Sequence, residues 1–557
     1  MEKLAEPLLP KRAITWLYER FLTGSIDQIG IWRRALPDAE VAKLSGSSHL
    51  LAMRNPSDAQ RCLDDYREFH EASRRKDVAA TERLGLSMRA FMARDRQRPV
   101  YHLTAPMDGI FDPAGAFFYK GRYHVFSYRN MVSLLTCTPL AHYVSDDLVH
   151  WRDAPIAIWA DSDLDVQGIW LANLFLDDDQ TPTMIYTALG ERGKIGVLAR
   201  SRDGLVSFGE KQAVMTDFVH HDGHTWKEGD TWYSITTRQY WGRRPGAFGD
   251  AIHLLTSSDL IHWTDRGEIF GIPRHEQPID DHQRNGVAEF PYLIPFGDKH
   301  VLMVGTRPVR YWTGRFDRNL PAFIPDDPRG KLLDGLNPFH CFNPSIVDQK
   351  GEGGATRRII LAMNSSVGGA VEGIPWYGVH VLPRVLTRDG DRLVQVPAPE
   401  VERLRGPHFH VDRISVKESA TDFVPHASGD TLEIIAEFSP GTAKRFGLKV
   451  RTGPKGENGT KIYYDVSTGR FGVEGGLKPL SKDPELGAAA AFIGAGEPVK
   501  LRVFLDRSLL EIFVNGQSMT GVFSCNPDDV GLDLFSEGGD ATLVSLDAWK
   551  MKSIWPE

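Results

Sequence analysis

Three carboxylates stand in short frames that are typical of strand ends, and each falls in a different part of a repeated pattern. They are Asp112 in Phe-Asp-Pro-Ala-Gly, Asp222 in His-Asp-Gly and Glu289 in Ala-Glu-Phe-Pro. Splitting a glycosidic bond needs one carboxylate that attacks or stabilises the sugar cation, and one carboxylic acid that protonates the leaving oxygen. A third carboxylate can hold the ring through its hydroxyls. We therefore take these residues as candidate catalytic groups for a glycoside.

An internal repeat indicates how such carboxylates are brought together. Ser-Asp-Asp-Leu-Val-His-Trp at 145–151 resembles the segments at 201–208 and 257–263, with a period of about 56 residues. Apolar runs that favour strands precede the copies, at 121–128, 194–199 and 251–255. Strands repeated at this period over about 300 residues predict an all-β fold that begins with a five-bladed β-propeller at 97–405. A sandwich is the rival fold, but it would not explain the repeat.

The segments on either side of the expected propeller have other patterns. Alternating strands without the repeat follow it, and they predict a C-terminal β-sandwich at 406–557. The stretch 51–96 is rich in Ala, Arg, Glu and Leu and predicts a helical linker of one or two helices. Residues 1–50 resemble the closing strands and short helix of a laminin-G or concanavalin-like sugar-binding module. Because about 50 residues cannot build that sandwich alone, we expect this N-terminal β/helical extension to pack within the molecule.

Composition excludes several classes of partner. The 557 residues carry a net charge of −8 without long charged runs, so neither nucleic acid nor an anionic membrane is expected as a partner. A small carbohydrate substrate fits better, and self-association into a homo-oligomer is left open. The four cysteines are scattered, which suggests buried thiols and no disulfide framework or zinc site. The start has no basic segment leading into a long apolar run, so we expect a cytoplasmic protein.

The order of the three carboxylate frames resembles glycoside hydrolase family 32, the invertase, inulinase and levanase family. The resemblance covers about residues 97–555 and implies a five-bladed propeller followed by a β-sandwich. Asp112 matches the nucleophile of the family's Asn-Asp-Pro-Asn box, and Asp222 matches the transition-state stabiliser of its Arg-Asp-Pro box. Glu289 matches the general acid and base of its Glu-Cys-Pro box. The resemblance implies no cofactor and no metal.

Several residues that hold the terminal fructose in this family are replaced here. The Asn before the nucleophile is Phe111, the Asn after Pro113 is Ala114, and the Gln expected after the first strand is Tyr128. The Arg of the Arg-Asp-Pro box is His221, and the Phe-Ser-Gly-Ser stretch reads Trp-Leu-Ala-Asn at 170–173. Sites built to hydrogen-bond particular hydroxyls discriminate strongly, so we expect the accepted sugar to change. The expected substrate-binding set is Phe111, Tyr128, Trp170, Asn173, His221, His224, His282 and Arg284.

Structural roles are the better interpretation for other conspicuous residues. Asp147, Asp203 and Asp259 recur with the repeat and are expected to make turns between strands. Trp151 and Trp263 are expected in the core. The histidines at 220, 221, 224 and 282 lack a regular ligand spacing, so we expect sugar contacts or plain surface there and no metal site.

Together these features predict a retaining, exo-acting glycosidase that hydrolyses β-fructofuranosyl linkages of sucrose, fructo-oligosaccharides or fructans. Asp112 would form a covalent intermediate about 5 to 5.5 Å from Glu289, and Asp222 would stay ionised and bind ring hydroxyls. A fructosyltransferase, a related furanosidase such as an arabinofuranosidase, and a non-catalytic fructan-binding protein remain alternatives. The sequence does not determine the linkage, or exo against endo action.

Overall fold

The computed structural model describes most of the chain beyond residue 55. The described residues are 56–130, 138–191, 193–217, 220–240, 242–274, 284–306, 308–335, 344–351, 356–418, 422–423, 427–475, 488–490, 498–522 and 525–556. The expected partial module at 1–50 and His282 lie outside them, as do Cys137 and Cys341. Residues from Ser57 to Glu557 form one compact unit.

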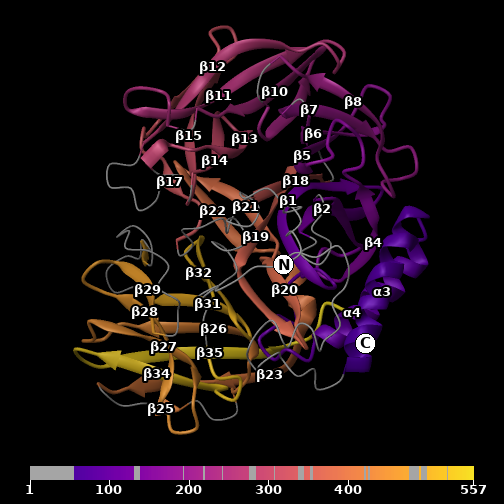
Figure 1. Ribbon diagram of the computed structural model, residues 1–557. Coiled ribbons are helices and arrows are strands. Elements are labelled where there is room, and N and C mark those ends of the chain that lie inside the picture. Colours follow the sequence, from indigo (N-terminus) through magenta and orange to yellow (C-terminus); the bar gives the residue numbers. More distant parts are fainter. Residues whose placement is uncertain are drawn as a thin grey trace, which may run out of the picture. The chain divides into compact units, whose positions relative to one another are not determined.

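Four blades of antiparallel strands follow one another along the chain (Figure 1). Blade 1 contains β1 (Asp108–Tyr119), β2 (Arg122–Asn130), β3 (Leu140–Ser145) and β4 (Trp151–Ile158). Blade 2 contains β5 (Gly168–Leu176), β6 (Pro182–Gly190), β7 (Gly193–Arg200) and β8 (Gly209–Met215). Blade 3 contains β9 (Gly223–Glu228), β10 (Thr231–Arg238), β11 (Phe248–Ser257) and β12 (Thr264–Pro273). Blade 4 contains β13 (Glu289–Phe296), β14 (Lys299–Gly305), β15 (Val309–Asp317), β16 (Ala322–Pro325) and β17 (Lys331–Leu332). Each blade begins with its inner strand.

Blade 5 also closes the ring. It contains β18 (Pro344–Lys350), β19 (Thr356–Val371), β21 (Arg384–Asp389) and β22 (Arg392–Pro397). The long strand β19 continues into a hairpin with β20 (Ile374–His380), and β20 pairs in parallel with β1 at Asp108↔Trp376 and Gly109↔Tyr377. Blade 5 and blade 1 therefore share one hydrogen-bonded sheet.

The sequence repeat marks the same turn in three blades, between β3 and β4, β7 and β8, and β11 and β12. The expected turn role of the repeated aspartates is confirmed, because Asp147, Asp203 and Asp259 each accept hydrogen bonds from backbone N–H groups two to four residues ahead. The leucine of each copy has a positive φ, between 67 and 74°. The Trp151 side chain is buried and Trp263 is partly buried against core residues, as expected.

A β-sandwich follows the 3₁₀ turn Pro399–Leu404. One sheet contains β23 (Arg405–Val411), β24 (Ile414–Val416), β26 (Thr431–Ser439), β31 (Val499–Asp506), β32 (Leu509–Val514), β33 (Gln517–Val522) and β35 (Ala541–Met551). The other contains β25 (Asp422–Phe423), β27 (Arg445–Thr452), β28 (Asn458–Asp465), β29 (Arg470–Glu474), β30 (Ala488–Ala490) and β34 (Gly531–Glu537). The predicted all-β fold, a propeller followed by a sandwich, is confirmed. The exact domain boundaries stay a prediction.

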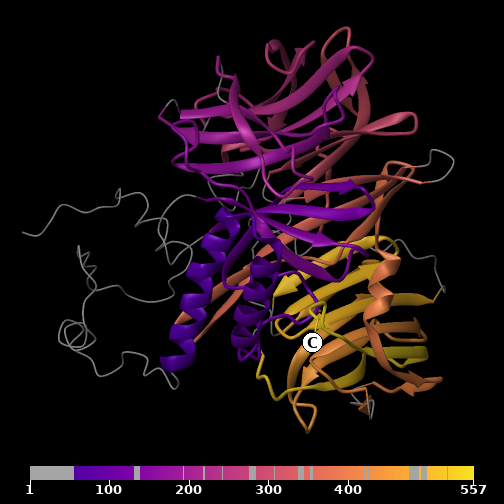
Figure 2. The same ribbon diagram turned by 90° about the vertical axis from the view of Figure 1, so that its right-hand side faces the viewer.

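Two helices lie in the region for which the sequence predicts helix, α3 (Pro56–Arg74) and α4 (Val78–Met92). They run beside blade 1 (Figure 2), and their apolar side chains join a core with residues of β4, β19, β20, β32 and β33. The buried Arg89 binds Asp153 of β4 through two hydrogen bonds, of 3.0 and 2.8 Å. Among the described residues, no helix has both the length and the apolar character needed to span a membrane. Of the two described cysteines, Cys62 is buried, Cys525 is half-buried, and both are free.

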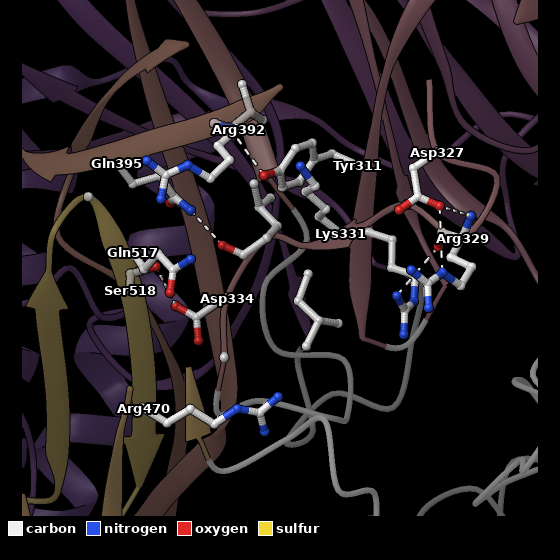
Figure 3. Close-up of a pocket in the computed structure, with 17 residues that line it drawn as sticks. Tyr311, Asp327, Arg329, Lys331, Asp334, Arg392, Gln395, Arg470, Gln517 and Ser518 are labelled. Carbon is white, nitrogen blue, oxygen red and sulfur yellow. Dashed lines mark hydrogen bonds and ion pairs between the residues drawn. The ribbon is translucent and has the colours of Figure 1, made fainter. Parts of the chain in front are cut away.

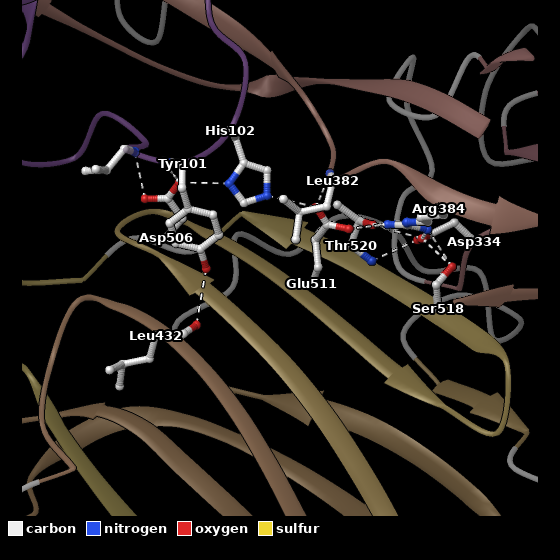
Figure 4. Close-up of polar contacts among 11 residues, drawn as sticks. Tyr101, His102, Asp334, Leu382, Arg384, Leu432, Asp506, Glu511, Ser518 and Thr520 are labelled. Carbon is white, nitrogen blue, oxygen red and sulfur yellow. Dashed lines mark hydrogen bonds and ion pairs between the residues drawn. The ribbon is translucent and has the colours of Figure 1, made fainter. Parts of the chain in front are cut away.

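A buried polar network joins the propeller to the sandwich (Figure 4). His102, just before β1, contacts Asp506 at 2.8 Å and Glu511 at 2.9 Å, and Glu511 also accepts a 2.6 Å hydrogen bond from Arg384. Burial disfavours a charged imidazole, but the hydrogen bonds to the two carboxylates prevail and raise the pKa of His102 to about 9. An imidazolium bound on both sides by carboxylates therefore holds the two domains in register.

We predict that Gly378→Ala destabilises the fold strongly. Gly378 has a φ of +76°, and a Cβ there would lie 1.9 Å from the carbonyl oxygen of Ile110 in β1. Left-handed backbone costs about 1–2 kcal/mol and overpacking about 1–3 kcal/mol more, so we expect thermal or denaturant unfolding to show a loss of about 2–5 kcal/mol. Gly373 is the matched control, because its φ is +81° with nothing within 4 Å. If Gly373→Ala destabilised the protein equally, the close approach of β20 to β1 would not limit this position.

Candidate active site

The three candidate carboxylates lie near the beginnings of inner strands. Asp112 is the fifth residue of β1, Asp222 directly precedes β9, and Glu289 opens β13. These strands neighbour one another around the ring through β5. Because the inner strands of successive blades run in the same direction along the axis, their first residues meet at one face of the propeller. Residues separated by 177 positions in the chain are thereby brought together.

The backbone at this face is irregular in a repeated way. The pairing of β1 with β2 shifts around Pro113, that of β5 with β6 shifts after Ile169, and that of β13 with β14 shifts after Glu289. Bulges bend a strand and redirect its side chains, and they are frequent beside active sites. Asp222 and Phe290 also have positive φ values, of 55 and 52°. The local backbone geometry thus gives the carboxylate side chains directions that differ from the regular alternation of side chains along a strand.

The carboxylate of Asp112 is buried beside an aromatic wall. The Tyr128 hydroxyl donates a hydrogen bond to it, while the Tyr128 ring stacks on Phe111 at 5.7 Å between centroids. Phe111 also meets the edge of Tyr377 from β20 at 5.4 Å. Burial and the Asp112 charge raise the pKa of Tyr128 well above its usual range, so the phenol stays a donor. Phe111 and Tyr128 therefore lie beside the candidate nucleophile, where the sequence predicted them.

Asp222 is held by groups from three blades. Its backbone N–H donates to Thr187 of β6 at 2.8 Å, and its carbonyl accepts from Thr236 of β10 at 2.7 Å. Its carboxyl accepts a 3.1 Å hydrogen bond from the N–H of Phe290, next to Glu289. A carboxyl tied to the strand that begins with Glu289 has a fixed position relative to that residue.

His221 lies between two of the carboxylates. Its Nε2 is 3.5 Å from Asp222 Oδ2 and 3.9 Å from Glu289 Oε1. Burial and the neighbouring Glu289 charge raise the pKa of Asp222 to about 8. Asp222 is therefore easier to protonate than an ordinary carboxyl, because it is buried and lies near other negative charge. The expectation that it stays ionised remains a prediction.

Lys194, at the start of β7, is a functional candidate that sequence reasoning missed. Its Nζ is 3.0 Å from His221 Nδ1 and 2.9 Å from Gln239 Oε1, and it lies 4.2 Å from the ring centroid of Trp170. An ammonium only donates hydrogen bonds, so His221 Nδ1 accepts, and its Nε2 carries the hydrogen that faces the carboxylates. Burial lowers the pKa of Lys194 to about 8, against the attraction of Asp222 and Glu289. A lysine after a turn glycine gave no signal of this in the sequence.

Asp250, at the start of β11, was also missed and supports the strand of Glu289. It is fully buried, and its carboxylate accepts hydrogen bonds from the N–H of Tyr240 at 2.6 Å and of Ala288 at 3.1 Å. It therefore fixes the backbone immediately before Glu289. No motif around Asp250 distinguishes it from an ordinary strand residue.

Two predicted substrate contacts line a cavity of about 380 Å³. They are Asn173 and His224, together with residues from the later parts of the inner strands such as Trp226 and Pro295. The Asn173 side chain accepts the N–H of Thr225 at 2.8 Å, which ties β5 to β9. Their contact with substrate stays a prediction.

The last two predicted contacts, Arg284 and His282, stay predictions. Arg284 is exposed, and His282 lies outside the described residues. In the described part of the chain, no group of three or more His, Cys, Asp or Glu side chains is arranged to hold a metal ion.

Comparison with known proteins identifies a family. The N-terminal domain model of glycosyl hydrolases family 32 matches residues 102–397, and the C-terminal domain model of the same family matches residues 400–550. A levanase from Bacillus subtilis is 28% identical over 82% of this chain and 71% of its own length. A sucrose-6-phosphate hydrolase from Zymomonas mobilis is 25% identical over 82% of this chain and 92% of its own length. The crystal structure of fructan 1-exohydrolase IIa from Cichorium intybus has a similar fold, with a TM-score of 0.70, 18% identity, and coverage of 82% of this chain and 98% of the other.

We predict that Lys194→Met lowers kcat/KM by about 10- to 100-fold, as is typical when a group that orients a functional imidazole is removed. His221 would lose the donor that fixes its tautomer, and Asp222 and Glu289 would lose the attraction of a nearby positive charge. Lys194→Arg should restore part of the activity. Lys211→Met is the matched control, since Lys211 lies in the same blade and pairs with Asp161 and Asp165. Steady-state kinetics that showed equal values for Lys194→Met and Lys211→Met would contradict this role.

We predict that the free energy of unfolding of Asp222→Asn increases relative to that of the unchanged protein as the pH rises from about 4 to 8. A carboxyl with a pKa of about 8 when folded and 3.8 as its ordinary value holds its proton in the folded state and loses it on unfolding. The Asp222 carboxyl thus contributes fully to stability below pH 4. This contribution is lost as the pH rises to about 8, and the free energy of unfolding changes by at most about 1.4 kcal/mol per pH unit.

Thermal unfolding of both proteins across this pH range measures the effect. Asp177→Asn is the control, because Arg200 and backbone hydrogen bonds outweigh burial and lower the pKa of Asp177. Asp177 is then ionised in both states above pH 5, so its substitution should give a difference that does not vary with pH. A flat difference for Asp222→Asn as well would mean that Asp222 is ionised in the folded protein.

Proposed function

This chain belongs to glycosyl hydrolase family 32, and we propose that it is a retaining exo-glycosidase that hydrolyses β-fructofuranosyl bonds. The convergence of Asp112, Asp222 and Glu289 at one face of the propeller is the observation that carries the proposal. The relatives named above act, by their names, on levan, sucrose 6-phosphate and fructan. The substrate of this chain would be sucrose, a fructo-oligosaccharide or a fructan.

In the first step, the Asp112 carboxylate attacks the anomeric carbon and forms a carbon–oxygen bond as the glycosidic bond breaks. Glu289 gives its proton to the leaving oxygen. The Tyr128 hydroxyl donates to Oδ2 of Asp112 and so positions the carboxylate for attack. The anomeric carbon develops positive charge on the way, which the nearby carboxylates stabilise.

In the second step, water hydrolyses the Asp112 ester. Glu289 now takes a proton from the water, the new carbon–oxygen bond forms, and Asp112 leaves as a carboxylate. The two attacks come on opposite faces of the anomeric carbon and each inverts its configuration, so the overall configuration is retained. This role for Glu289 requires it to lose and regain a proton in each cycle.

Asp222, His221 and Lys194 would bind and orient the sugar. A protonated Asp222 can donate one hydrogen bond to a ring hydroxyl, and His221 offers an Nε2–H donor beside it. Lys194 behind His221 supplies the positive charge that the family places on the Arg of its Arg-Asp-Pro box. The cation is thus retained but set further from the sugar, which would alter the hydroxyls that the site accepts.

An arabinofuranoside is the second candidate substrate. Phe111, Tyr128 and Tyr377 form an apolar wall beside Asp112, whereas the family has polar residues at the first two positions. An apolar wall suits a sugar with fewer hydroxyls on that side, and the same two-step chemistry would apply. Transfer to another sugar in place of water also remains a proposal, as does the cytoplasmic location.

The test is a substrate panel of sucrose, 1-kestose, inulin, levan and p-nitrophenyl arabinofuranoside with three variants. We expect fructose release from at least one fructoside, and a loss of about 10²–10⁴-fold in kcat for Glu289→Gln. Asp112→Asn should be inactive on every substrate. Asp259→Asn is the control, because Asp259 makes a turn far from the carboxylates. Product analysis at high substrate concentration separates transfer from hydrolysis.

An aryl fructoside with a good leaving group assigns the two roles. Its departure needs no proton, so Glu289→Gln should recover much of the first step there, whereas Asp112→Asn should not. Equal losses on both kinds of substrate would contradict the acid role of Glu289. Activity on the arabinofuranoside alone would support the mechanism but identify an arabinofuranoside as the substrate. Sugar binding without turnover by a folded protein would favour the non-catalytic alternative.

A further inference from the structure

A separate cavity of about 480 Å³ lies where blades 4 and 5 meet the sandwich (Figure 3). Its walls come from β15 and β17 of blade 4, β22 of blade 5, and β29 and β33 of the sandwich. None of the candidate catalytic residues lines it. A cavity of this size is in the range of small-molecule sites, which often lie between domains.

The walls carry more positive than negative charge. Five cationic side chains line the cavity, Arg310, Arg329, Lys331, Arg392 and Arg470, against two carboxylates, Asp327 and Asp334. They come from blade 4, blade 5 and the sandwich, and in the view of Figure 3 Arg392 lies near the top, Arg470 near the bottom and Arg329 at the right. Guanidinium groups on several sides favour a compact anion that can accept paired hydrogen bonds.

The two carboxylates do not cancel this charge. Asp334 is engaged by Arg384 at 3.1 Å and by the N–H and hydroxyl of Thr520 at 2.8 and 2.9 Å, within the domain junction. Asp327 is 3.6 Å from Arg329, whose side chain is 87% exposed. In the described part of the chain, Arg470 forms no ion pair with a carboxylate.

Ion pairs at the rim of the cavity reduce its excess of positive charge only slightly. Lys331 contacts Asp391, and Arg392 lies 3.1 Å from Asp389, but these two carboxylates are 63 and 73% exposed. Exposed pairs are weak because water and salt screen them. Lys331 therefore remains able to turn toward an anion inside the cavity.

A neutral hydrogen-bond acceptor in the same wall indicates that the ligand carries a hydrogen-bond donor as well as an anionic group. The side-chain oxygen of Gln517, in β33, is buried and has no hydrogen-bond partner within the described residues. A buried acceptor without a partner is costly, so a donor from a ligand would stabilise it. A hydroxyl group is such a donor. Tyr311 and Leu393 give the cavity an apolar part against which a sugar ring can lie.

We propose that this cavity binds a small phosphorylated sugar, with the phosphate between Arg392 and Arg470 and a ring hydroxyl donating to Gln517. Arg392 belongs to the propeller and Arg470 to the sandwich, so the ligand bridges the two domains. This site is independent of the proposed function. Binding there stabilises the folded protein by linkage.

The test is isothermal titration of the full chain with glucose 6-phosphate and with inorganic phosphate, at constant ionic strength. We expect saturable binding of one glucose 6-phosphate, with affinity reduced at least tenfold by the double substitution Arg392→Gln and Arg470→Gln. Lysines at both positions should keep part of the affinity, because charge remains but the paired hydrogen bonds are lost. Gln517→Leu should weaken glucose 6-phosphate and leave inorganic phosphate unchanged.

Two controls separate this cavity from the catalytic face. Asp112→Asn should bind glucose 6-phosphate as the unchanged protein does, and the double glutamine variant should keep its kcat on the best substrate when no phosphate compound is present. Binding that survives the double substitution, or no saturable binding at all, overturns the proposal. Equal affinity for inorganic phosphate and glucose 6-phosphate overturns the proposal that the cavity recognises a sugar, and identifies inorganic phosphate as the ligand.

Discussion

The closure of the propeller is the constraint on which the rest of the structure depends. The parallel pairing of β20 with β1 draws blade 5 onto blade 1, and the absence of a side chain at Gly378 lets the two backbones approach. Only a closed ring brings the beginnings of β1, β9 and β13 to one face. The same hairpin places Tyr377 beside Phe111, so closure also builds the apolar wall next to Asp112.

Gathering carboxylates in a buried place has an electrostatic consequence. Burial and mutual repulsion favour protonation, which is why the pKa of Asp222 rises to about 8. Lys194 and His221 moderate this effect, since the lysine attracts Asp222 and donates to the far nitrogen of the His221 imidazole. Asp250 and the N–H of Phe290 then hold the backbone around Glu289. The protonation of the site is thus set by residues from several blades together.

The sandwich contributes through buried charge. His102, Asp506, Glu511 and Arg384 bind one another, and each would be costly if left alone in the interior. Such a network stabilises one relative placement of propeller and sandwich over others. The cavity beside it shares Asp334 and Ser518 with the network, so a ligand there would sense the same junction.

The sequence by itself determined the architecture and was enough to select three candidate carboxylates. The repeat carries three similar turns with their aspartates, and turn chemistry depends on neighbouring residues alone, so Asp147, Asp203 and Asp259 were interpreted correctly. The frames around Asp112, Asp222 and Glu289 are local in the same sense. Only the tertiary structure decided which other residues accompany them. Lys194 and Asp250 reach the site from blades 2 and 3, while Asn173 and His224, three and two residues along the chain from Trp170 and Asp222, line another cavity. The physical reason is that charge, burial and hydrogen bonding depend on distance in space, which short segments of sequence do not encode.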